Sequence, residues 1–216
     1  MSRPAAGGGR WVSVDPERLP AWLDGFAARH GAVEWHAGPE RVEVHAADGA
    51  LAACEVPLPP LTVDPDAPWG GLPAHALAER TVGVLLVRLG GFAAGVFAGS
   101  RLVASQTGSR PVHGRAAAGG WSQRRFARRR EGQARVALDA AAEAATAVLL
   151  PAVDTLHALV GGGDRRAVEA VLADARLASL RPLLSPRLLD VPDPRRRVLE
   201  DAPRLFRAVS IRVVEG

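Results

Sequence analysis

Residues 108–133 read GSRPVHGRAAAGGWSQRRFARRREGQ and join a glycine- and alanine-rich loop, which carries the lone glutamine Gln123, to the start of a helix. Gly119 and Gly120 have no side chains, so the main chain there can enter a space too narrow for ordinary residues. The first turns of the predicted helix carry arginines that can bind a phosphate backbone, namely Arg124, Arg125, Arg128, Arg129, Arg130 and Arg135. The pattern predicts that function lies at the tip of this loop.

The helix after the loop is predicted to be long, because no proline occurs between Trp121 and Pro151 and apolar residues recur at near-helical spacing. Its basic first half is expected to face solvent or a partner, and its alanine-rich second half to pack on a sheet. Before the loop, residues 81–89, 92–98 and 101–107 form three strand candidates separated by glycine-containing turns. They predict an antiparallel meander.

The remaining elements alternate between strands and helices. We predict a strand at 155–160, a turn at 161–163, a helix at 164–175, extended pieces at 180–189, a helix from about Pro194 and a closing strand at 209–214. This order predicts a layered α/β domain over residues 76–216. Gly161 to Gly163 could also cradle a phosphate, but they lack the lysine and serine or threonine of a P-loop, so a turn capped by Asp164 is favoured.

A small α+β unit is predicted over residues 1–60. It contains a strand at Trp11, a helix that begins with Asp15 and Pro16, and strands at 33–36, 41–46 and 51–56. Residues 61–75 are rich in proline and glycine, a composition that predicts a linker.

Composition indicates a globular protein. The chain has 216 residues, of which 48% are hydrophobic and 23% charged, and its net charge is +4. It contains no lysine, so every basic residue counted is an arginine. Residues 1–80 carry eleven acids against six arginines, whereas residues 81–216 carry twenty-one arginines against twelve acids. The two halves are therefore expected to have different partners.

Several classes of protein and site are excluded by the pattern. No apolar run approaches the roughly 18 to 20 residues of a membrane span, and no signal-peptide segment is recognisable, which predicts a soluble cytoplasmic protein without membrane contact. The single cysteine, Cys54, lies in an apolar context and is predicted to be a buried filler. Six scattered histidines lack the spacing of zinc ligands, so no metal or cofactor is predicted.

The loop and helix resemble a known family. The similarity is to the GGQ loop and following helix in the catalytic domain of archaeal and eukaryotic class I release factors, and it is carried by His113-Gly114-Arg115, Gly119-Gly120, Ser122, Arg125-Phe126-Ala127-Arg128 and Arg130. Here residues 116–118 form an insertion, and Trp121 stands where an ungapped match places the glutamine, with Gln123 two positions later. This GG-x-x-Q arrangement resembles the release-factor-like peptidyl-tRNA hydrolases of ribosome quality control, in particular their actinobacterial branch.

The resemblance implies a release-factor-like mixed sheet with packed helices, and ribosome-dependent hydrolysis of the ester in peptidyl-tRNA. Gln123, Gly119 and Gly120 would form the catalytic tip. Because a glutamine side chain is neutral, it would position water and stabilise the oxyanion rather than act as a general base. The implied partners are large-subunit rRNA and peptidyl-tRNA, and the implied RNA contacts are His113, Arg115, Trp121, Ser122, Arg124, Arg125, Arg128 and Arg129.

Alternatives stay open at this stage. Trp121 could staple the helix start to the domain instead of stacking on RNA, and the arginines could be a solvated helix face. The same fold could cut the 3′ end of the tRNA, or serve as a non-catalytic RNA-binding or rescue-recruitment module. Arg195 to Arg197, with Asp193, Glu200 and Asp201 nearby, predict a surface helix held by ion pairs.

Overall fold

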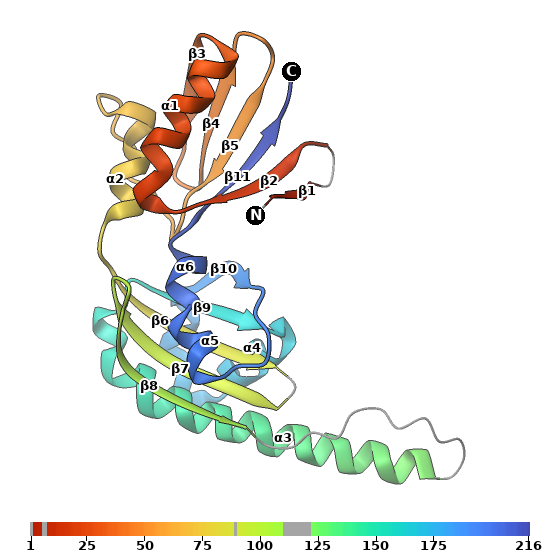
Figure 1. Cartoon of the computed structure of the whole chain (residues 1–216). Coiled ribbons are helices and arrows are strands. Elements are labelled where there is room, and N and C mark those ends of the chain that lie inside the picture. The colour runs from red at the N-terminus through yellow and green to blue at the C-terminus, as the bar shows by residue number, and fades with distance from the viewer. Residues whose placement is uncertain (1, 6–7, 89, 110–121) are drawn as a thin grey trace. The chain divides into compact units, whose positions relative to one another are not determined.

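A computed structural model describes residues 2–5, 8–88, 90–109 and 122–216, except for the side chains of Ser2 and of residues 122–131. The chain forms two compact units (Figure 1). Unit 1 comprises Met1–Ala78 and Arg204–Gly216, and unit 2 comprises Glu79–Pro203. Both units combine a sheet with helices, so the predicted α/β class is confirmed.

Unit 1 is built on a six-stranded antiparallel sheet with the strand order β1-β2-β11-β5-β4-β3. The predicted strands of the N-terminal unit are confirmed within a few residues. The bounds are β1 Ser2–Pro4, β2 Arg10–Val14, β3 Val33–Ala37, β4 Arg41–Ala46, β5 Leu51–Glu55 and β11 Val209–Val214.

Helix α1 (Leu19–His30) covers the inner face of this sheet through Leu19, Leu23 and Phe26, which are fully buried. It follows the short 3-10 helix η1 (Pro16–Arg18), where Pro16 takes the predicted first position. Alternate residues of the strands supply the other side of the core, as the two-residue period of a strand requires.

The structure corrects the predicted domain boundaries. Residues 61–75, predicted as a linker, include η2 (Pro68–Gly71) and the start of α2 (Leu72–Leu77), and Leu61 and Leu72 are buried in the core of unit 1. Prolines interrupt regular backbone pairing here, but they do not prevent apolar side chains from packing. Strand β11, predicted as part of the second domain, pairs instead with β2 and β5 of unit 1.

Unit 2 is built on a five-stranded mixed sheet with the order β10-β9-β6-β7-β8. The predicted meander is confirmed, because β6, β7 and β8 are antiparallel neighbours, while β9 and β10 extend the sheet in parallel to β6. The bounds are β6 Thr81–Arg88, β7 Gly91–Ala98, β8 Arg101–Ser109, β9 Ala158–Gly163 and β10 Leu184–Leu189.

Helices α3 (Ser122–Leu149) and α4 (Arg165–Leu172), with the 3-10 helix η4 (Ala175–Leu183), pack in one core against one face of this sheet. The single long helix predicted after the loop is thus confirmed as α3. The remaining helical segments are η3 Leu150–Thr155, α5 Arg196–Glu200 and α6 Ala202–Phe206.

Three local predictions are wrong in this part of the chain. Residues 155–157 are not strand, since η3 extends to Thr155, and residues 180–183 are helical rather than extended. Gly161 to Gly163 form the end of β9 instead of a turn. A Cβ on Gly162 would lie 2.5 Å from Leu86 Cδ2, so the strand needs glycine there because its neighbours approach closely.

The predicted capping role of Asp164 is confirmed, because its carboxylate accepts hydrogen bonds from the backbone N–H groups of Arg166 (2.9 Å) and Ala167 (3.3 Å). Asp164→Ala is expected to destabilise unit 2 by about 1 kcal/mol, since two N–H groups of α4 lose their acceptor. Denaturant unfolding measures the change, with the exposed Asp154→Ala as control. Equal effects of the two substitutions would contradict the capping role.

Candidate nucleic-acid interface and active site

The predicted site lies on the connection from β8 to α3. Strand β8 is the last strand of the sheet, and it pairs with β7 from Ala98↔Arg101 to Gly91↔Ser109. Residues 110–121 follow in the sequence, and α3 begins at Ser122. They are thus flanked by a sheet strand and by a 28-residue helix.

Gly108 lets β8 pass close to the ring of Phe92 just before residues 110–121. A Cβ at Gly108 would lie 2.5 Å from Cζ and 3.0 Å from Cε2 of Phe92, which is itself buried in the core of unit 2. Only a residue without a side chain lets β8 cross the Phe92 ring at this distance.

Gly108→Ala is expected to destabilise unit 2 by about 1 to 3 kcal/mol, because the core must move to admit the methyl group. Gly132→Ala is the matched control: no atom lies within 4 Å of its added Cβ, and it is expected to stabilise α3 by up to about 1 kcal/mol. Urea unfolding of both variants measures the two changes. Changes of the same sign would contradict the close packing at Gly108.

Helix α3 has two halves with different roles. Its C-terminal half packs on the sheet through residues at helical spacing, which include Ala141, Ala145 and Leu149. Residues 132–136 carry no buried side chain. Figure 1 shows the N-terminal half extending beyond the sheet, as the sequence predicted for its basic half. From Ser122 to Ala137 the helix rises about 22 Å.

The N-terminal half of α3 concentrates positive charge. Residues 122–135 contain six arginines and one acid, Glu131, and the first turn contains no acidic residue. The helix dipole adds partial positive charge at the same end. Like charges at i, i+4 spacing destabilise a helix by a few tenths of a kcal/mol per pair, so a polyanion bound here would relieve the repulsion.

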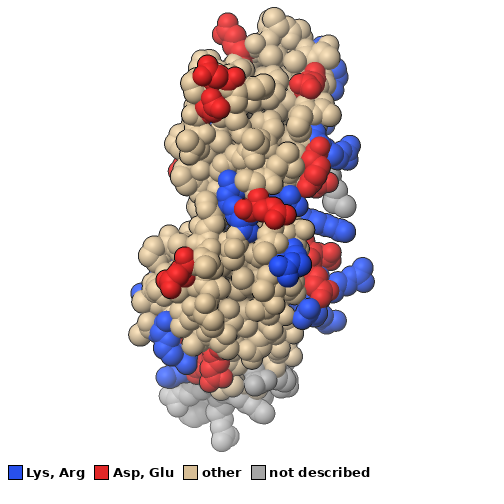
Figure 2. Space-filling view, turned by 90° about the vertical axis from the view of Figure 1, so that its left-hand side faces the viewer, with Lys and Arg blue, Asp and Glu red and all other residues tan. Residues whose placement is uncertain are grey.

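Elsewhere basic side chains lie beside acidic ones, as Figure 2 shows for the face that it presents. Arg196 pairs with Glu200 at 2.6 Å, which confirms the predicted surface helix with ion pairs. Arg176 pairs with Asp174 at 2.7 Å, and hydrogen bonds from the Arg176 side chain and backbone lower the pKa of Asp174 to about 2. These arginines are therefore partly neutralised within the protein.

The structure places the predicted residues in two groups. His113, Arg115, Gly119, Gly120 and Trp121 lie in 110–121, outside the described residues. The others lie in the first turns of α3, where the backbone but not the side chains are described: Ser122, Gln123, Arg124, Arg125, Arg128 and Arg129.

Gln123 was predicted to be carried by the loop, and this detail is wrong, because it is the second residue of α3. A helix leaves its first four N–H groups without intrahelical acceptors. Gln123 therefore offers a backbone donor as well as its carboxamide, at the positive end of the helix dipole.

A family model matches residues 80–212, more than half of the chain, and its description is the Actinobacteria/chloroflexi VLRF1 release factor. The chain belongs to this VLRF1 release-factor family. The match begins at the start of unit 2 and includes most of β11. The chain is therefore a relative of release factors.

Solved structures similar to this VLRF1 family member include translation factors. An archaeal translation termination factor, aRF1, is 16% identical with a TM-score of 0.44, and the match covers 76% of this chain and 51% of aRF1. The chain thus spans about half the length of aRF1.

The S. cerevisiae factor Dom34, described as translation termination-like and involved in RNA quality control, is 9% identical with a TM-score of 0.35. That match covers 94% of this chain and 66% of Dom34. No curated protein matches the sequence.

Helix α3 of this VLRF1 protein also corrects the prediction that no stretch is apolar enough to cross a membrane. Gly132–Thr155 meets that criterion by length and composition. Ala141, Ala145 and Leu149 are fully buried against the sheet of unit 2, which identifies the stretch as a core helix.

Metal binding and cysteine chemistry have little support among the residues that the structure describes. There, no group of three or more His, Cys, Asp or Glu residues is arranged to hold a metal ion. Cys54 is buried as predicted, and its burial raises the thiol pKa to about 12, so the reactive thiolate is suppressed.

Proposed function

We propose that this chain hydrolyses the ester of peptidyl-tRNA on stalled ribosomes or large subunits and so releases the nascent peptide. The observation that carries the proposal is that the GG-x-x-Q sequence leads directly into α3, whose residues 122–135 carry six arginines and one acid. Membership of a release-factor family supports it. The proposed partners are large-subunit rRNA and peptidyl-tRNA, in the cytoplasm.

In this mechanism Gln123 acts by position. Its carboxamide or its backbone N–H donates to the oxygen that becomes negative when water attacks the ester, and the helix dipole adds to this stabilisation. Gly119 and Gly120 let the tip approach the tRNA end closely. The ribosome supplies the orientation, which is worth roughly 7 to 11 kcal/mol in well-arranged systems, so the isolated chain is expected to be nearly inert.

The basic half of α3 anchors the tip on rRNA. Arg124, Arg125, Arg128 and Arg129 contact phosphates, and Ser122, Arg115 and His113 add polar contacts. Trp121 stacks on a base or ribose near the tRNA end, a contact worth about 1 to 3 kcal/mol.

The test uses purified stalled large subunits that carry labelled peptidyl-tRNA, with intact stalled ribosomes in parallel. A gel that resolves peptidyl-tRNA from free tRNA is expected to show release only when ribosomal particles are present. Sequencing of the released tRNA is expected to give an intact 3′ end. A shortened 3′ end would assign the chain to nucleolytic cleavage, and absence of release would remove the hydrolase proposal.

A second function, non-catalytic rescue, is favoured by one observation. The tripeptide is interrupted by Trp121 and Ser122, and Gln123 lies within the helix rather than in the loop. A module of this kind would bind ribosomes through its arginines and recruit another factor. It is supported if arginine substitutions abolish binding while Gln123→Ala changes no product.

A further inference from the structure

Unit 1 contains a groove of about 580 Å³ between β2 and α1. Figure 1 shows β2 and α1 diverging from the short segment that connects them. The volume of the groove lies within the range of small-ligand sites, about 300 to 1,000 Å³. Its lining combines apolar, aromatic and charged residues, which include Val12, Val14, Asp15, Arg18, Trp22 and Arg29.

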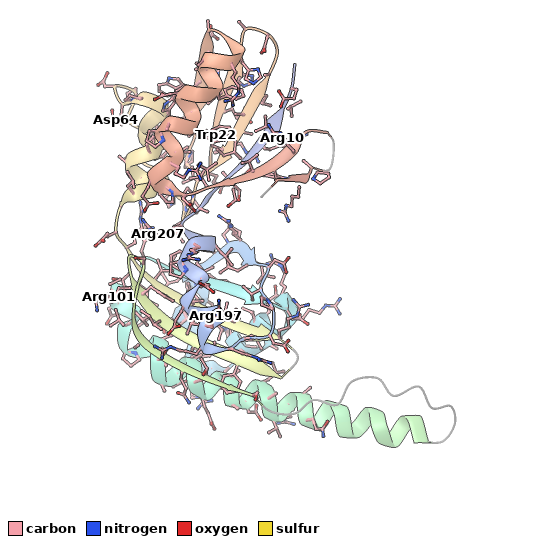
Figure 3. The ribbon with its side chains drawn as sticks, viewed as in Figure 1. Arg10, Trp22, Asp64, Arg101, Arg197 and Arg207 are labelled. Carbon is pink, nitrogen blue, oxygen red and sulfur yellow. The ribbon has the colours of Figure 1, made fainter. Side chains whose placement is uncertain are left out.

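Trp22 supplies an aromatic surface in this groove (Figure 3). Its ring stacks on Phe26, with ring centroids 5.9 Å apart and planes 14° from parallel. Phe26 is fully buried, and this stack holds the half-buried indole in place. A planar ligand in the groove can extend the stack without reorganising the protein.

Two arginines flank Trp22: Arg18 is the last residue of η1, directly before α1, and Arg29 lies on α1. Arg18 lies one turn before it and Arg29 two turns after it, and both are exposed. In the described part of the chain, neither guanidinium makes a hydrogen bond or ion pair. The Nη1 atom of Arg29 lies 3.4 Å from the position that a Cβ on Gly25 would occupy, so this arginine folds along the groove wall.

The acids around the groove offset little of this charge. Glu17 is paired with Arg207 at 3.0 Å, which leaves Asp15 as the unpaired acid among the lining residues that the structure describes. Unit 1 as a whole has eleven acids against eight arginines. A polyanion is therefore not attracted to unit 1 in general, and a bound anion must be recognised locally at Arg18 and Arg29.

We propose that this groove binds a nucleobase that carries phosphates, with the base stacked on Trp22 and the phosphates held by Arg18 and Arg29. The two arginines are about 16 Å apart along the helix axis, so they reach different phosphates of one single-stranded RNA segment. Aromatic stacking combined with cationic side chains is the arrangement by which proteins bind single strands. This binding is independent of Gln123 and of peptide release.

The test measures binding of a short fluorescein-labelled oligouridylate by anisotropy, away from the ribosome. The background is the full chain with Arg124, Arg125, Arg128 and Arg129 replaced by Gln, which removes four of the six arginines of residues 122–135 and so reduces the contribution of α3. On this background Trp22→Leu is expected to weaken binding roughly 5- to 150-fold, the loss of one stacked base. Arg18→Gln/Arg29→Gln is expected to reduce the salt slope of binding by about 1.4.

Three controls keep the result interpretable. Trp22→Phe retains an aromatic ring on Phe26 and is expected to retain most of the affinity, which separates stacking from loss of fold. Arg3→Gln/Arg41→Gln removes the same charge from strands β1 and β4 and is expected to leave binding unchanged. Uridine monophosphate as competitor separates the two sources of the ligand: weak competition identifies an RNA chain, and strong competition a free nucleotide.

Two results would overturn the proposal. One is equal affinity of the background chain, Trp22→Leu and the arginine double variant. The other is equal displacement of the oligouridylate by a glutamate-rich peptide of the same charge, because such a surface recognises anionic peptides without regard to a base.

Discussion

Gln123→Ala is expected to slow peptide release from stalled large subunits by about 10²- to 10³-fold, the usual loss when one oxyanion donor is removed. Binding to the particle is expected to stay unchanged, because the lost contact forms only in the transition state. Single-turnover release at saturating protein measures the rate, and co-sedimentation with the subunits measures binding.

Gln106→Ala is the matched control for this substitution. Gln106 is exposed on β8 in the same unit, so the same side chain is removed without a change at the tip. It is expected to release peptide at the wild-type rate. Wild-type release by Gln123→Ala would contradict a side-chain role, and a loss of binding that accounts for the slower release would show that Gln123 positions the loop.

Neutralisation of Arg124, Arg125, Arg128 and Arg129 to glutamine is expected to weaken ribosome binding strongly. The slope of log affinity against log salt concentration should become shallower by roughly 3. Each phosphate contact on a single strand contributes about 0.7 to that slope, and four contacts are lost. The isolated protein is expected to become more helical at the same time, since repulsion along α3 is removed. Binding titrations at several salt concentrations and circular dichroism measure the two effects.

Ribosome binding is expected to fall while helicity rises, and this combination makes the prediction specific to α3. In the control variant, glutamine replaces four exposed arginines elsewhere in unit 2, which removes the same charge: Arg101, Arg166, Arg195 and Arg197. Figure 3 marks two of them, Arg101 on β8 and Arg197 on α5. Equal loss of binding in both variants would show that net charge, rather than the cationic helix, drives association.

Local pattern predicted most of the elements but not their partners. The sequence predicted a strand at Val209–Val214, yet nothing local could assign it to β2 and β5 of unit 1, because the strand order depends on residues far apart in the sequence. The glycines of β9 were misassigned because close approach of Leu86 and Leu189 is a tertiary property.

The candidate site was likewise predictable from the sequence only in part. The residue types around Gln123 and the family resemblance came from the sequence alone, whereas its position inside α3 came from the structure. The sequence predicted the helix that contains Trp22 but not the groove that this residue lines. Trp22 lies about 60° around the helix from Leu19, so it sits at the flank of the buried face and lines the groove.

The position of β11 has a consequence for biosynthesis. This strand lies between β2 and β5, and its Ile211 pairs with Val12, roughly two hundred residues earlier in the chain. At a translation rate of about 5 to 20 residues per second, β2 therefore waits for about 10 to 40 seconds before its partner is made. The five strands of unit 2 lie in one continuous segment, so unit 2 can form its sheet before β11 is available to pair with β2 and β5 in unit 1.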